Sequence, residues 1–225
     1  HMNPEHSSGR GHVQASFIPY LKETMRSMWN EPNYRIAIFF LVLLAVATSG
    51  APFMVAAARD QLKATAQAQG YFSLVYLGTT AGLGWVLGLL ADRYGYRLVA
   101  CICSGLVTLS FLVCLTIPHI GFWYLAYGAF SITNMALGMI LCNLSAELCP
   151  DIAPNRLMAV GNILVVGFVL TTTTLSGAIV DWTGIYMPAF IANLVLSLIA
   201  VFGFAFIVRE PRSGQRYIIK TTPRG

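Results

Sequence analysis

The stretch Ile36–Ala58, which reads IAIFFLVLLAVATSGAPFMVAAA, contains no charged residue and decides the fold. The hydrocarbon core of a bilayer is about 30 Å thick, so roughly 20 apolar residues in a helix can cross it. Five similar stretches follow along the chain, and we place the six spans at about Ile36–Ala58, Gly70–Ala91, Leu98–Pro118, Ile120–Ala146, Leu157–Val180 and Tyr186–Val208. The sequence therefore predicts an all-α membrane protein with six transmembrane helices.

The composition and the placement of charge support this prediction. Apolar residues make up 56% of the chain and charged residues only 10%, whereas about a quarter of the residues are charged in ordinary globular domains. Of the 14 basic residues, only Arg59 and Lys63 fall on one side of the predicted spans. Because Lys and Arg near a membrane resist translocation, the other side should be cytoplasmic. We expect both termini in the cytoplasm, contact with membrane lipid, and no nucleic-acid partner.

The segments outside the spans are short, which predicts a single membrane domain. We assign residues 1–15 to a tail with a cloning remnant, 16–35 to an amphipathic cytoplasmic lead-in, 36–208 to the six-helix transmembrane domain, and 209–225 to a basic cytoplasmic tail. Apolar side chains recur at helical spacing in the lead-in, as in a helix that lies along a membrane face. Asn30, Glu31 and Pro32 should end this helix before the first span.

The second span carries four glycines in two pairs, Gly78 with Gly82 and Gly84 with Gly88. Small residues four positions apart let helix backbones approach closely in lipid, where van der Waals contact supplies much of the association energy. We expect this helix to be packed on both sides.

The turn after this span reads GLLADRYGYR from Gly88 to Arg97. It resembles the signature loop of the major facilitator superfamily, Gly-x-Leu-Ala-Asp-Arg-x-Gly-Arg-Arg/Lys, although Tyr96 stands where a basic residue is usual. The resemblance implies a major-facilitator-type half bundle. It also implies a conformational latch between two halves, formed by Gly88, Asp92, Arg93, Gly95 and Arg97. The alternative is that the two arginines only hold the turn on the cytoplasmic side.

Transporters of this family have two six-helix halves, with the substrate bound between them and access alternating by rocking. One set of six spans supplies only one half. Three arrangements are open: a half of a longer transporter, a natural half that works as a homodimer, and a half that needs another partner chain. The lead-in Leu21–Arg35 resembles the linker between the sixth and seventh helices of such transporters, which favours the C-terminal half.

The resemblance places the first and fourth helices of a half beside the central cavity. In the first span, Thr48, Ser49 and Pro52 are candidate cavity residues, because Pro52 cannot donate to the carbonyl of Thr48 and should kink the helix. A packing kink whose backbone groups are satisfied by hydroxyl side chains is the alternative.

In the fourth span, Tyr127, Ser131, Asn134 and Gly138 recur on one helix face. A polar stripe in lipid is costly unless it faces protein or water. We therefore expect this face to point inward, with Asn134 as the best candidate for substrate contact. Hydrogen bonding between helices without a substrate is the alternative.

No Asp, Glu, Lys or Arg lies in the middle of a predicted span, and we find no pattern of catalytic, metal-ligating or cofactor-binding residues. We therefore expect no enzyme and no cofactor. The expected function is secondary-active or facilitative transport of a small-molecule substrate by alternating access. The other six-helix half would come from the same parent chain or from a second copy. A non-transporting membrane scaffold or assembly factor on the same fold is the alternative. We expect the protein in the inner membrane of a bacterium.

Overall fold

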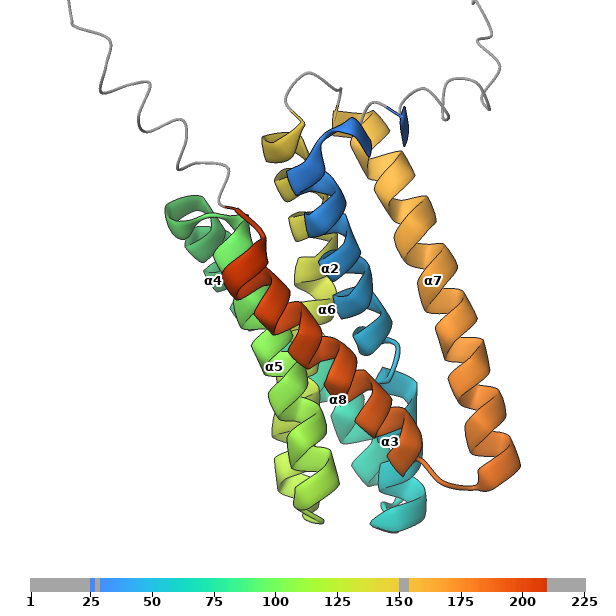
Figure 1. The fold of residues 1–225 in the computed structure, drawn as a ribbon. Helices are drawn as coiled ribbons and strands as arrows, with labels where there is room; N and C mark the ends of the chain where they lie inside the picture. Colours follow the sequence, from blue (N-terminus) through green and yellow to red (C-terminus); the bar gives the residue numbers. More distant parts are fainter. Residues whose placement is uncertain (1–24, 27–28, 150–153, 210–225) are drawn as a thin grey trace, which may run out of the picture.

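The computed structural model describes residues 25–26, 29–149 and 154–209. These residues form a bundle of long helices and contain no strand (Figure 1). The elements are α2 (Pro32–Thr48), α3 (Ala51–Gln61), α4 (Ala66–Tyr94), α5 (Tyr96–Thr116), α6 (Ile120–Leu148), α7 (Pro154–Thr183), α8 (Met187–Phe202) and the short π-helix η1 (Gly203–Ile207). The predicted all-α membrane fold is confirmed.

Six segments of the described chain are long and apolar enough to cross a membrane. Helices α2 and α3 together form the first, Pro32–Gln61, and α8 continues into η1 to form the sixth, Met187–Ile207. Each agrees with a predicted span, so the chain is an integral, multi-pass membrane protein. Most of the expected lead-in lies outside the described residues. At its described end, Glu31 is extended before Pro32 begins α2. The division into tail, lead-in and domain stays a prediction.

Helices α5, α6 and α8 pack around an aromatic core. The Phe111 ring lies 6.2 Å from Phe130 and 5.8 Å from Phe190, between ring centroids, and Trp123 lies 6.3 Å from Phe190. The buried Trp123 also donates from Nε1 to the carbonyl of Ile117, at 2.9 Å. This bond satisfies the indole polar group, so the ring can fill the core at no hydrogen-bonding cost.

Hydroxyl groups link the same helices within the apolar interior. The Ser110 hydroxyl on α5 donates to the carbonyl of Ala126 on α6, at 2.8 Å, and the Thr108 hydroxyl lies 2.9 Å from the Ser197 hydroxyl on α8. Such bonds between helices stabilise a membrane bundle, because lipid offers no alternative partner. They join α5 to both α6 and α8.

Helices α4 and α7 lie at the edge of the bundle. Of the most apolar 18-residue window, 17% is buried in α4 and 6% in α7, against 61% in the first span. On α4, a Cβ added at Gly78, Gly82 or Gly88 would meet nothing within 4 Å. The expectation that this helix is packed on both sides is therefore wrong for the described chain. The glycine spacing indicates a close neighbour, but not which helix supplies it.

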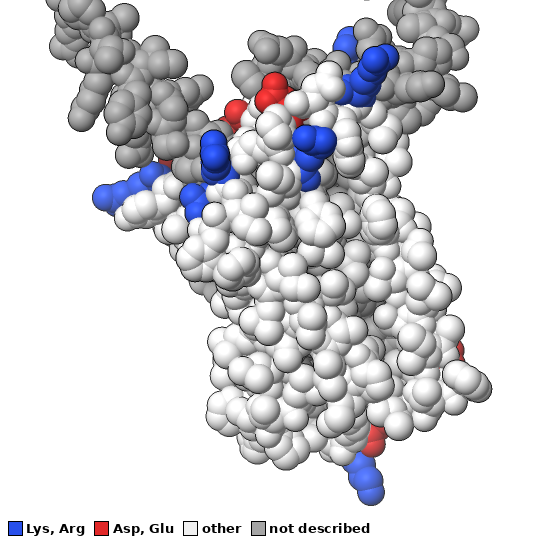
Figure 2. Space-filling view, viewed as in Figure 1, with Lys and Arg blue, Asp and Glu red and all other residues white. Residues whose placement is uncertain are grey.

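On the face shown in Figure 2, charged side chains gather at the two ends of the bundle, and its middle carries almost none. We call one end the basic end; α2, α5 and α7 begin there, and its arginines include Arg35, Arg93, Arg97, Arg156 and Arg209. The opposite end carries Arg59, in the last turn of α3, and Lys63, between α3 and α4. This asymmetry is the one on which the predicted orientation depends.

Candidate transport site

The first span is broken at the position that Pro52 predicts. Helix α2 ends at Thr48 and α3 begins at Ala51. Between them the backbone tightens: the amide of Ser49 donates to the carbonyl of Val46, at 3.0 Å, and the amide of Gly50 to that of Ala47, at 3.4 Å. Pro52 has no N–H, so the carbonyl of Thr48 loses the donor that a continuous helix would provide.

The break is packed tightly against two neighbouring helices. A Cβ added to Gly50 would lie 2.6 Å from Cζ of Phe111 on α5 and 2.7 Å from Nδ2 of Asn193 on α8. Only glycine therefore fits at this position. The Ser49 amide bonds to the carbonyl of Val46, so the carbonyl of Ala45 lacks its usual helical donor. The Thr48 hydroxyl donates to this carbonyl instead, at 2.7 Å.

Two polar groups near this break have no hydrogen-bond partner among the described residues. They are Oγ of Ser49 and Nδ2 of Asn193, and both atoms are buried. An unpaired buried donor costs free energy, so such a group calls for an explanation. Asn193 was not among the predicted site residues. Its position opposite the break depends on how α8 packs against α2, which no local pattern in the sequence reveals.

The predicted cavity residues of the first span lie in different surroundings. Thr48 and Ser49 are buried within the described bundle, whereas Pro52 is exposed at the start of α3. The polar side chains at the break thus face the interior of this bundle. Contact of Thr48 and Ser49 with a substrate stays a prediction.

The polar face of α6 is buried near one end of the helix and exposed nearer the other. Near the opposite end, Tyr127 is half-buried, and its ring packs edge-on against Phe72 of α4 at 5.2 Å. Ser131 is fully buried, and its hydroxyl donates to the carbonyl of Tyr127 at 2.6 Å. Nearer the basic end, Asn134 and Gly138 are exposed. The structure thus covers the first part of this face and leaves the second part open.

The open part of this face lies on a helix that contacts both edge helices, α4 and α7. A Cβ added at Gly138 would meet nothing within 4 Å, and the Asn134 amide is exposed beside it. An amide within the span of a membrane helix needs protein or water as its neighbour. The geometry therefore supplies a polar, uncovered surface that can donate and accept hydrogen bonds.

The signature turn is made at Gly95. Gly95 ends α4 with φ 96° and ψ 157°, a conformation that favours glycine, and its amide donates to the carbonyl of Ala91 at 2.8 Å. Asp92 and Arg93 are exposed, and the Arg93 guanidinium lies 5.6 Å from the centroid of the Tyr94 ring. Gly88 meets no close neighbour within the described chain. The latch role of these residues stays a prediction.

Arg97 makes contacts that the sequence does not predict. Its Nε donates to the carbonyl of Phe204 at 2.7 Å, and its Nη2 donates to the carbonyl of Ala205. Both carbonyls belong to η1, where the amide of Val208 bonds five residues back to the carbonyl of Gly203. Arg97 therefore joins the signature turn to the end of the sixth span.

Among the described residues, no group of three or more His, Cys, Asp or Glu side chains could hold a metal ion. The five cysteines, Cys101, Cys103, Cys114, Cys142 and Cys149, form no disulfide. The functional groups of the candidate site are thus an amide, hydroxyls and backbone carbonyls. Such groups bind a solute by hydrogen bonding.

Comparison with known proteins agrees with this description. A search among curated proteins found no match. The model of the Major Facilitator Superfamily matches residues 7–222, nearly the whole chain, and includes all six spans and the signature turn. Members of this family are transporters. The chain belongs to the Major Facilitator Superfamily.

Proposed function

We propose that this chain transports a small solute by alternating access, as one six-helix half that works with a second half. The observation that carries the proposal is the open part of the α6 face, where Asn134 and Gly138 are exposed between two sparsely packed helices. An isolated half would leave this polar face against lipid, at a cost. A second half opposite it would enclose a polar cavity near the middle of the membrane.

The uncovered faces of α4 and α7 supply the contact surface for the second half. Gly78 and Gly82 on α4 would let a helix of that half approach closely. The second half belongs to the same parent chain or is a second copy. The resemblance of the lead-in to the linker of complete transporters favours the C-terminal half of a longer chain.

Within this arrangement, Asn134 contacts the substrate and the break at Ser49–Gly50 lets the first span bend. The turn Gly88–Arg97 acts as the latch between halves at the basic end. That end faces the cytoplasm, so both termini lie in the cytoplasm. The membrane is the inner membrane of a bacterium. With no Asp, Glu, Lys or Arg in the middle of a span, this half binds its solute without a charge partner. It performs no enzymatic reaction.

Solute flux tests this proposal. The transporter that contains this chain is first screened for thermal stabilisation by a panel of metabolites, because a bound ligand raises the melting temperature. Uptake of the best ligand into liposomes is then measured for the wild type, Asn134→Ala and Asn143→Ala. Asn143 is the matched control: it lies on the opposite face of the same helix and donates to the carbonyl of Met139 at 2.9 Å.

We expect Asn134→Ala to lower uptake by about tenfold, as for one lost hydrogen bond to the substrate. Asn143→Ala should leave it nearly unchanged. Equal effects of the two changes would contradict the assignment of Asn134. No uptake of any solute, together with stable capture of a partner protein, would favour a scaffold.

A further inference from the structure

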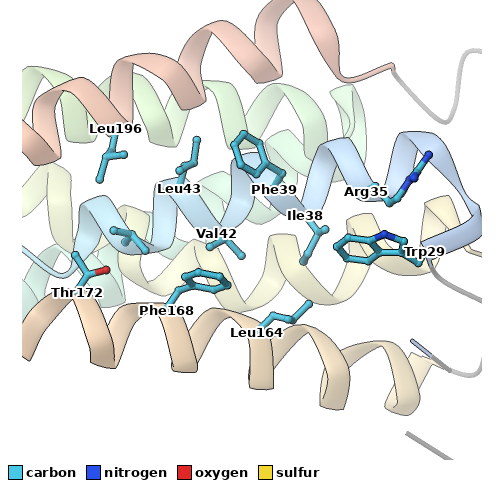
Figure 3. Close-up of a pocket in the computed structure, with 11 residues that line it drawn as sticks. Trp29, Arg35, Ile38, Phe39, Val42, Leu43, Leu164, Phe168, Thr172 and Leu196 are labelled. Atoms are coloured by element: carbon cyan, nitrogen blue, oxygen red, sulfur yellow. The ribbon is translucent and has the colours of Figure 1, made fainter. Parts of the chain in front are cut away.

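A trough runs along the outside of the bundle, with α2 as its floor and α7 and α8 as its sides. Figure 3 shows Ile38 and Val42 on α2 beside Phe168 and Leu164 of α7, with Leu196 of α8 on the other side. The cavity here encloses about 420 Å³. None of the seven predicted cavity residues lines it, so the trough is separate from the candidate transport site.

A second groove of about 410 Å³ adjoins the first, between the start of α2 and Ile207 of η1. The two grooves share Trp29, Arg35 and Phe39. Phe39 is 55% exposed and stands between them. Two apolar grooves thus meet beside one arginine, at the basic end of the bundle.

The depth of the first groove matches one leaflet of a bilayer. It extends from Arg35 to Val46 along α2, and a helix rises 1.5 Å per residue, so Val46 lies about 16 Å deeper than Arg35. Half of a hydrocarbon core is about 15 Å thick. A groove of this length suits an acyl chain that belongs to the leaflet at the basic end.

The walls of both grooves are mainly apolar, whereas their shared mouth carries a charged side chain. Among the described residues, Arg35 is the only charged one that lines either groove, and it is exposed. No salt bridge joins a carboxylate of the described chain to Arg35. A guanidinium binds phosphate oxygens through two parallel hydrogen bonds. Trp29 lies beside it, and indole rings favour the headgroup level of a membrane.

We propose that this trough binds a two-chain anionic phospholipid of the leaflet at the basic end. Its phosphate pairs with Arg35, one acyl chain lies in the α2–α7–α8 groove, and the other lies in the groove beside Ile207, on the far side of Phe39. The chain's own last segment does not suit the site, because Arg212, Arg216 and Lys220 carry the same charge as Arg35.

Native mass spectrometry of the full chain tests this proposal. The protein is equilibrated in micelles with equal amounts of phosphatidylglycerol and phosphatidylcholine that have the same acyl chains, and retained lipid is counted. We expect phosphatidylglycerol to be favoured about fivefold, as for one basic residue near the membrane surface. Arg35→Gln should abolish this preference. Arg209→Gln, which removes the same charge from the same end but lines neither groove, should preserve it.

A second pair of variants tests the apolar groove. Val42→Trp fills it and should lower the retention of both lipids severalfold. Val195→Trp adds the same bulk to an exposed position of α8 outside both grooves and should change nothing. Equal effects of the two arginine variants would overturn the proposal, and so would full lipid retention by Val42→Trp. The proposal would also fail if the wild-type chain formed dimers that Val42→Trp abolished. The last result would assign the trough to a second copy of the chain.

Discussion

Arg97, in the first turn of α5, donates from Nε to the carbonyl of Phe204 in η1, at 2.7 Å. A cation is unfavourable at the start of its own helix and favourable at the end of another. The favourable contact of the Arg97 guanidinium with the end of η1 therefore offsets its unfavourable interaction with the dipole of α5. It also satisfies two carbonyls in the last turn, where the helix ends and supplies no further amide donors.

Replacing Arg97 with Gln should destabilise the end of the sixth span. Hydrogen bonds to charged groups contribute about 1.5–3 kcal/mol, so the free energy of unfolding should fall by a similar amount. Hydrogen exchange of residues 203–208 should rise in the same variant. Arg93→Gln is the control, because Arg93 is exposed and lies over its neighbour Tyr94. Equal loss of stability in both variants would show that the η1 contact contributes nothing of its own.

The close approach of η1 to α2 depends on Gly203. A Cβ at this position would overlap the ring of Phe40, which is buried. We expect Gly203→Ala to lower the free energy of unfolding by about 1–3 kcal/mol, the usual cost of overpacking. Thermal or denaturant unfolding in detergent measures it.

The control for this change is Gly105→Ala. Gly105 lies within α5, and a Cβ there would meet nothing within 4 Å. Alanine favours the helix more than glycine does, so this variant should be unchanged or slightly stabilised. The double variant Phe40→Leu with Gly203→Ala should recover part of the loss if the ring is its cause. No recovery would point instead to strain in the backbone of η1.

The membrane spans could be predicted from the sequence because bilayer thickness sets their length. The break near Pro52 and the turn at Gly95 were equally predictable, since each follows from the chemistry of one residue. Arg97 could not be paired with η1 in advance, because that contact joins positions 107 and 108 residues apart. The glycine spacing likewise indicated a close neighbour for α4, but not that Met135 of α6 approaches only Gly84 and leaves Gly78 and Gly82 open.

The polar face of α6 was predicted in part for the same reason. Helical periodicity places Tyr127, Ser131, Asn134 and Gly138 on one face. It carries no information on which neighbouring helix covers which part of that face. At one end of the face, Phe72 of α4 packs against Tyr127 and covers it. At the other end, Asn134 is exposed among the described residues.

Replacing Gly82 with Leu tests the α4 surface as the contact for a second half. Because Gly82 is exposed with open space around it, the stability of this chain should change by less than about 0.5 kcal/mol. Solute flux by the complete transporter should nevertheless fall, since the larger side chain keeps the second half away. Gly70→Leu is the control, as Gly70 is equally open but lies on another face of α4. Unchanged flux in Gly82→Leu would place lipid, rather than protein, against this face.

Replacing Asn193 with Leu tests whether its buried amide has a structural or a functional role. Its Nδ2 has no partner among the described residues, and leucine of similar size would remove an unsatisfied donor. We expect Asn193→Leu to raise the free energy of unfolding by about 1 kcal/mol or more. Asn143→Leu should not, because it would remove the donor to the carbonyl of Met139. If Asn193 holds the break at Ser49–Gly50 in a second conformation, the stabilised variant should also transport more slowly. A variant that is more stable and equally fast would restrict Asn193 to packing, whereas one that is less stable would require a partner for its amide in the folded transporter.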